Sequence, residues 1–92
     1  MLVAAVTACA PDSVRRDPAF DAWTYRVGKE CYPHPIGSAQ VWDLMREAAF
    51  LDLTSRLYHR KIDAKEFTGW VNTFYPGNNK AAIDCIVARL PK

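Results

Sequence analysis

The strongest constraint on the fold is a helical period in the C-terminal half of the chain. The positions i, i+3, i+4 and i+7 are occupied by four large apolar residues, Phe67, Trp70, Val71 and Phe74. The segment Asp63-Ala64-Lys65-Glu66 comes just before them and resembles a capping box, which marks a helix start. We therefore expect a helix from this segment to the turn at Tyr75-Pro76-Gly77-Asn78, with its apolar face buried.

Three other segments show the same period. Asp17-Pro18 is a strong helix start, and Pro33 and Pro35 stop the helix whose stripe is Phe20, Trp23, Val27 and Cys31. A second, longest helix is expected from Gly37-Ser38 to about Arg60, with a wide apolar face. A final helix is expected from near Asn79 to Pro91, carrying Ala82, Ile83, Ile86, Val87 and Leu90.

These patterns predict an all-α fold, a small antiparallel bundle of about four helices over residues 17–92. No alternating strand pattern and no internal repeat is seen. The aromatic residues at helical spacing are expected in the core: Trp23, Trp42, Trp70 and Phe74. A domain of this size buries only about 60–65% of its unfolded surface, so a covalent staple would add much to its stability.

Composition and motifs exclude several functions. A net charge of +2 gives no case for nucleic acid, and no apolar run approaches the roughly 20 residues of a membrane-spanning helix. Cys31-Tyr32-Pro33-His34 has a C-x-x-H spacing that His59 and Cys85 could complete as a zinc site, but only half of this pattern is local. A Cys–His nucleophile and the scattered carboxylates Asp43, Glu47 and Asp52 are weaker still. We expect no enzyme, no metal, no cofactor and no small-molecule substrate.

Residues Val6-Thr7-Ala8-Cys9 resemble the lipobox of bacterial lipoproteins: an apolar residue, a small one, Gly or Ala, then Cys. The resemblance implies that residues 1–8 are a signal-peptide remnant, that Cys9 carries lipid, and that residues 9–16 form a polar tether. Because Ala10 rather than Asp follows, it implies anchoring to the outer membrane, facing the periplasm. No Lys or Arg precedes the short apolar run, so a cytosolic protein with a buried Cys9 is the alternative.

Export would place the other two cysteines, Cys31 and Cys85, in an oxidising compartment, where a disulfide is expected. In the chain-entropy model, closing a loop of this length stabilises by about 4 kcal/mol. Two separate buried thiols are the alternative. Contact with another protein is expected at the end of the second helix, where the candidates are Arg56, Tyr58, Arg60, Lys61 and Lys65. This basic cluster would meet an acidic partner protein or anionic headgroups, unless it is only a solvated helix end.

The segment Ile83-Asp84-Cys85-Ile86 and the helical, cysteine-stapled outline look like the immunity proteins of type VI secretion amidase effectors. The resemblance covers about the last third of the chain. The whole chain is shorter than those proteins usually are, and no toxin-binding residue is carried over. We therefore expect a non-catalytic exported lipoprotein that binds another protein, as an immunity or inhibitor protein for a periplasmic toxin. The alternatives are a structural lipoprotein subunit of a secretion system or pilus, and a cytosolic helical adaptor.

Overall fold

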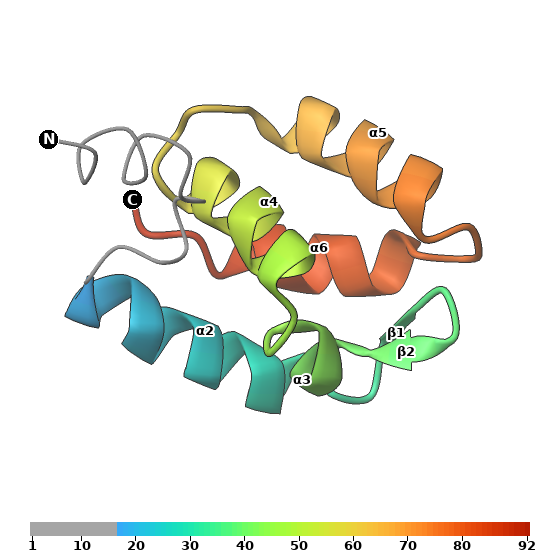
Figure 1. Ribbon diagram of the computed structural model, residues 1–92, viewed down its shortest axis with the longest axis horizontal. Coiled ribbons are helices and arrows are strands. Elements are labelled where there is room, and N and C mark those ends of the chain that lie inside the picture. Colours follow the sequence, from blue (N-terminus) through green and yellow to red (C-terminus); the bar gives the residue numbers. More distant parts are fainter. Residues whose placement is uncertain (1–16) are drawn as a thin grey trace, which may run out of the picture.

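The structure is a computed structural model that describes residues 17–92 (Figure 1). These residues contain five helices and one short hairpin. In chain order the elements are α2 (Pro18–Glu30), β1 (Pro35–Ile36), β2 (Ala39–Gln40), α3 (Val41–Leu44), α4 (Ala48–Tyr58), α5 (Ala64–Phe74) and α6 (Lys80–Ala88). In Figure 1, α2 and α5 lie on opposite sides of the molecule, with α4 and α6 between them. The mostly helical character is confirmed, but an all-α bundle of about four helices is wrong for these residues.

Side-chain caps fix where α2 and α5 begin, as the sequence predicts. The carboxylate of Asp17 caps α2 by accepting a hydrogen bond from the N–H of Phe20 at 3.1 Å. In the capping box of α5, Oδ1 of Asp63 accepts from the N–H of Glu66 at 2.8 Å, and the N–H of Asp63 donates to Oε1 of Glu66 at 3.4 Å. The final helix also forms as expected, and it ends at Ala88.

The single helix expected from Gly37-Ser38 to about Arg60 is wrong, because its first part is a hairpin. Gly37-Ser38 is the turn between β1 and β2, whose register pairs Pro35 with Gln40 and Ile36 with Ala39. Gly37 has a φ of 61°, and a two-residue turn that begins with such a residue matches the twist of paired strands. Strands of two residues are too short to show the alternating pattern by which a strand is found in a sequence.

The rest of that expected helix is broken between α3 and α4, at Met45, Arg46 and Glu47. No proline or glycine marks the break, and Glu47 precedes α4 without a side-chain cap. The break lets the two halves pack in different directions, since α3 packs against α2 whereas α4 packs against α5. The wide apolar face in the sequence therefore belongs to two helices, each with its own neighbour.

Trp42 on α3 packs directly on the backbone of α2. A Cβ atom at Gly28 would lie 2.9 Å from Cε3 of Trp42, closer than van der Waals contact allows. Glycine weakens a helix by about 1 kcal/mol relative to alanine. The close approach of the indole ring explains why glycine nevertheless stands at this position.

One buried side chain, Asn79, fastens the hairpin to the turn between α5 and α6. Its Oδ1 accepts a hydrogen bond from the N–H of Gly37 at 2.7 Å. Its Nδ2 donates to Oδ1 of Asn72 at 3.0 Å and to the carbonyl oxygen of Tyr75 at 2.7 Å. Because these bonds satisfy the buried amide, they fix the position of a hairpin too short to be stable alone.

Contacts between α2 and α6 close the described domain. The predicted disulfide between Cys31 and Cys85 is confirmed, and it joins the end of α2 to the middle of α6. Nε1 of Trp23 donates to the carbonyl oxygen of Arg89 at 2.7 Å, and the Arg89 side chain pairs with Glu30 at 2.5 Å. The fully buried core beside them includes Val27, Val41, Phe50, Leu57, Phe67, Val71 and Ile86.

Candidate binding surfaces

The disulfide removes both cysteines from the alternative zinc site and from the alternative Cys–His pair. A bonded sulfur offers no thiolate to a metal or to a substrate. His34 lies in the bend after α2, whereas His59 lies at the C-cap of α4. Within residues 17–92, no group of three or more His, Cys, Asp or Glu side chains is placed to hold a metal ion.

The five residues expected to bind a partner lie at the end of α4, in the turn that follows, and at the start of α5: Arg56, Tyr58, Arg60, Lys61 and Lys65. Nε of Arg56 pairs with Oδ2 of Asp52 at 3.1 Å on the same helix. Arg60 and Lys61 line a cavity, and Lys65 is exposed in the first turn of α5, outside the lining. The structure therefore brings two of the five residues to a concave site.

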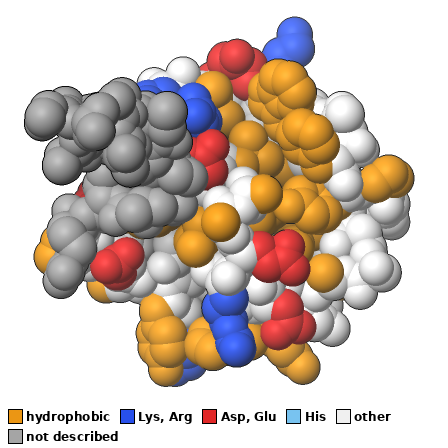
Figure 2. Space-filling model, in the orientation of Figure 1, with side chains coloured by type: hydrophobic (Ala, Val, Ile, Leu, Met, Phe, Trp, Pro, Cys, Tyr) orange, Lys and Arg blue, Asp and Glu red, His pale blue; other side chains and the backbone are white. Residues whose placement is uncertain are grey.

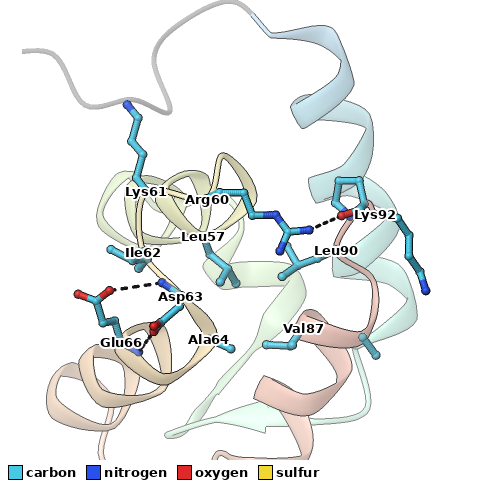
Figure 3. Close-up of a pocket in the computed structure, with 12 residues that line it drawn as sticks. Leu57, Arg60, Lys61, Ile62, Asp63, Ala64, Glu66, Val87, Leu90 and Lys92 are labelled. Atoms are coloured by element: carbon cyan, nitrogen blue, oxygen red, sulfur yellow. Dashed lines mark hydrogen bonds between the residues drawn. The ribbon is translucent and has the colours of Figure 1, made fainter.

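This cavity has a volume of about 580 Å³ and opens where the end of α4, the start of α5 and the residues after α6 meet (Figure 3). Its apolar side chains include Leu57, Ile62, Val87 and Leu90, and its cations are Arg60, Lys61 and Lys92. Figure 3 shows Arg60 reaching toward the C-terminal residues, where Nη2 donates to the carbonyl oxygen of Pro91 at 2.5 Å. Lys61 and Lys92 point away from the recess, whose border carries these cations and the acids Asp63 and Glu66.

Two acids also line this cavity, and their carboxylates accept hydrogen bonds from backbone N–H groups at the start of α5. Asp63 and Glu66 form the capping box described above, shown by dashed lines in Figure 3. The positive end of a helix dipole favours negative charge at this place. Arg60 likewise donates to a neutral carbonyl group, so the cavity lining carries both positive and negative charge.

Arg60 has a backbone conformation that usually belongs to glycine. Its φ is 62°, and it occupies the left-handed position of a Schellman motif that ends α4. In this motif the N–H of Lys61 donates to the carbonyl of Arg56 at 2.8 Å, and the N–H of Arg60 donates to the carbonyl of Leu57 at 3.1 Å. A left-handed residue with a Cβ costs about 1–2 kcal/mol. The bonds of this helix-ending motif account for the left-handed conformation of Arg60.

Tyr58 packs within the domain and offers little of its ring to a partner. Its ring centroid lies 5.2 Å from that of Phe20, 5.0 Å from that of Trp23 and 4.9 Å from that of His59. The side chain is half-buried among these rings. Its clearest role is to hold the end of α4 against α2.

A hydrogen bond between the side chains of Asp17 and His59 joins the start of α2 to the end of α4. Nε2 of His59 lies 2.8 Å from Oδ2 of Asp17, and Nδ1 lies 2.9 Å from the carbonyl oxygen of Ser55. Both ring nitrogens thus lie within hydrogen-bond distance of oxygen atoms. The hydrogen bond from His59, followed by that from the N–H of Phe20, lowers the pKa of Asp17 below its ordinary value of 3.8.

The lowered pKa of Asp17 makes stability depend on pH in the acid range. A carboxyl whose folded pKa is depressed stabilises the fold above its unfolded pKa, and this contribution is lost as the pH falls through the folded pKa. We expect wild type to lose more free energy of unfolding between pH 5 and pH 2 than the variant Asp17→Asn, which keeps an N-cap side chain but cannot ionise. Urea unfolding at several pH values measures this, and equal losses in both proteins would contradict it.

A pair of aromatic side chains on α5 is exposed, contrary to the prediction that both lie in the core. Trp70 is 48% exposed and Phe74 is 60% exposed, and their rings stack with centroids 5.5 Å apart and planes 12° apart. Figure 2 shows hydrophobic side chains gathered over α5. Phe67 and Val71 turn inward and are fully buried. The four apolar residues that the sequence placed in one stripe therefore lie on two faces of the helix. Of the two other expected core tryptophans, Trp23 is buried and Trp42 is half-buried.

A second recess lies on α2 and α3, on the side of Tyr25. Its volume is about 490 Å³, and its apolar and aromatic lining side chains are Phe20, Tyr25, Trp42, Met45 and Leu51. The ring of Tyr25 is 59% exposed and lies edge-on to Trp42 at 5.4 Å, with Nζ of Lys29 5.2 Å from the Tyr25 ring centroid. Tyr25 is thus held by two neighbours, whereas Trp70 and Phe74 stack only with each other among the ring contacts of the described residues.

The lipidation site and the expected tether lie outside the described residues. This holds for Cys9, for the signal-peptide remnant at residues 1–8 and for the tether at residues 9–16. No helix within residues 17–92 is both long enough and apolar enough to span a membrane. Comparison of the chain with known protein families, with curated proteins and with solved structures finds no match.

Proposed function

We propose that this chain is an exported lipoprotein that acts by binding another protein, as an inhibitor or immunity protein. The observation that carries the proposal is the exposed, stacked pair of Trp70 and Phe74 on α5. Large aromatic side chains are enriched at the centres of protein interfaces, where burial on binding repays their exposure in the free protein. The α5 face, named here by Trp70 and Phe74, is therefore the proposed partner-binding surface.

The neighbours of this pair leave it accessible. Apart from its chain neighbours and the backbone of its own helix, Gly69 has no atom within 4 Å of the position that its Cβ would take. A partner can therefore approach the helix backbone closely beside the two rings. The remaining exposed positions around the pair include Asn72 and Thr73, which are small and uncharged. A surface of this kind suits an apolar recess on the partner, with polar contacts at its rim.

Export is supported by the disulfide between Cys31 and Cys85, because such bonds persist in oxidising compartments and are rare in the cytosol. This favours an exported protein over a cytosolic adaptor. Lipid anchoring is supported by the lipobox resemblance of Val6-Thr7-Ala8-Cys9. Intact mass of the native protein from membranes tests both points. A chain that begins at Cys9 with acyl groups supports the anchor, and an unmodified chain beginning at Met1 in the soluble fraction refutes it.

The partner-binding surface is tested by site-specific photo-crosslinking in the native envelope. A benzophenone amino acid at position 74 is expected to give one major crosslinked product, and the same group at exposed Lys29 is the matched control. The variant Trp70→Ala should reduce the product at position 74 at least tenfold, since interface aromatics commonly contribute about 2 kcal/mol. A single secreted enzyme in the product supports an inhibitor, and several assembly subunits support a structural role. Equal crosslinking from positions 74 and 29 refutes the α5 face.

A further inference from the structure

We propose that two copies of this chain associate through their α5 faces, and that this contact covers Trp70 and Phe74 until the partner protein replaces the second copy. The inference rests on the proposed function, in which the same face binds a partner, and it adds how that face is regulated. The two side chains are 48% and 60% exposed in the single chain. Three features of the structure favour a second copy as their cover.

The first is the shape of the α5 surface, which is complementary to itself. Residues four apart form rows along a helix, and helices pack by fitting the rows of one into the grooves of the other. On α5, Trp70 and Phe74 form a ridge of stacked rings with centroids 5.5 Å apart. The neighbouring row holds Gly69 and Thr73, whose small side chains leave a groove. In a symmetric pair, the ridge of each copy therefore fits the groove of the other.

This groove can be covered without leaving an unpaired donor. The hydroxyl group of Thr73 already donates to the carbonyl oxygen of Gly69 at 2.9 Å. The space that a Cβ of Gly69 would occupy is open, apart from its chain neighbours and the backbone of its own helix. An aromatic ring of a second copy can therefore lie over both residues and avoid the cost of burying an unsatisfied polar group.

The second feature is that the two rings lie in an uncharged stretch of the chain. Residues 67–79 contain no Asp, Glu, Lys, Arg or His. The charges that flank this stretch occur in opposite signs, with Lys65 beside Glu66 on α5 and Lys80 paired with Asp84 at 2.6 Å on α6. A symmetric interface brings identical surfaces together, and like charges at its centre would cost several kcal/mol. The α5 face meets its own copy without this repulsion.

The third feature is the position of α5 and the size of the contact it offers. This helix lies on the opposite side of the molecule from α2, so a second helix can lie beside it (Figure 1). The two rings, with their exposed fractions, offer about 200 Å² of apolar surface on each copy. A standard interface buries about 800 Å² per partner, so the dimer is a weak one. We expect a dissociation constant of about 10–100 μM, weak enough for a partner protein to displace the second copy.

Sedimentation equilibrium of the purified full chain with Cys9→Ser, from about 5 μM to about 1 mM, tests the proposal without any partner. We expect monomer at the low end and dimer at the high end. Each substitution occurs twice in a symmetric interface, so Trp70→Ala, at about tenfold per ring, should weaken the dimer about 100-fold. Gly69→Gln should fill the groove and weaken the dimer at least tenfold. Tyr25→Ala removes a comparably exposed ring on α2, and this matched control should change the dissociation constant less than twofold.

Circular dichroism checks that the variants are folded. Glutamine favours a helix more than glycine does, so unfolding would not explain a loss of association in Gly69→Gln. A chain that stays monomeric at about 1 mM would overturn the proposal, as would equal weakening by Trp70→Ala and Tyr25→Ala. Assemblies that grow beyond a dimer and need both Trp70 and Tyr25 would also overturn it, because the rings would then lie in the recess on α2 and α3 of the next copy.

Photo-crosslinking from position 74 in the native envelope tests the partner protein separately. A crosslinked product made only of two copies of this chain would refute the partner and support self-association. A product with another protein, from a chain that is monomeric when purified, would support the proposed function and overturn self-association. The two failures are therefore distinguishable.

Discussion

Reduction of the bond between Cys31 and Cys85 is expected to destabilise the domain by about 4 kcal/mol. The two residues are separated by 54 positions, and the chain-entropy model assigns a loop of that length a cost of this order. Small domains have only about 5–15 kcal/mol of net stability, so much of the total would be lost. At 4–8 °C per kcal/mol for a domain of this size, the Tm should fall by about 16–32 °C.

Thermal unfolding of the Cys9→Ser chain with and without reductant measures this loss and avoids any contribution from Cys9. The double variant Cys31→Ala with Cys85→Ala is the second measurement, because it shows the same loss without added thiol. Unreduced protein heated in the same buffer is the control. A Tm that changes by less than 5 °C in both experiments would show that the contacts of Trp23 and Arg89 suffice to hold α2 against α6.

The variant Phe67→Ala is expected to cost about 3–5 kcal/mol, whereas Trp70→Ala on the same helix should cost about 1 kcal/mol or less. Phe67 is fully buried and lies edge-on to Phe50 at 6.4 Å, so its truncation leaves a cavity in the core. Trp70 is half exposed, and its loss removes mainly a contact with Phe74. The larger aromatic side chain should therefore matter less for stability.

Urea unfolding of Phe67→Ala, Trp70→Ala and Phe74→Ala, measured at one pH, checks this ranking. Phe67→Leu is the control for volume and should cost less than about 1.5 kcal/mol. If Trp70→Ala proved as destabilising as Phe67→Ala, its ring would belong to the core and the α5 face would lose its support. Photo-crosslinking at position 74 then separates loss of binding from loss of folding.

Local signals in the sequence were enough to predict α2, α5 and α6. The cap at Asp17 and the capping box of Asp63 and Glu66 are contacts between neighbours in the chain, so the sequence contains both partners. The pairing of Cys31 with Cys85 was also predicted, because export leaves few other uses for two such cysteines. For the helix starts, the information needed was the residue type at a known spacing.

The remaining parts depend on contacts between distant residues. The hairpin is held by Asn79, which lies 42 positions from Gly37 in the sequence. The break at Met45 to Glu47 serves packing against α2 and α5 and has no signal of its own. Periodicity placed Trp70 and Phe67 in one stripe, and only the neighbours of α5 decide which of its sides is covered.

The candidate site was predictable in part for the same reason. A basic cluster at a helix end is visible in the sequence, and Arg60 and Lys61 do border a cavity. The wall formed by Val87 and Leu90 comes from the other end of the chain and could not be placed beforehand. Tyr58 was a candidate for contact with a partner, and its contacts with Phe20 and Trp23 could not be foreseen because they cross between helices.

The disulfide also decides how the domain would respond to mechanical force. A pull applied between Asp17 and Lys92 passes along the chain to Cys31, across the bond to Cys85, and on to the end. Residues 32–84 are bypassed and bear no tension. Even a fully unravelled domain would therefore lengthen to only about 80 Å at about 3.5 Å per residue, and most of the core, with α5 and its two exposed rings, would stay unstretched.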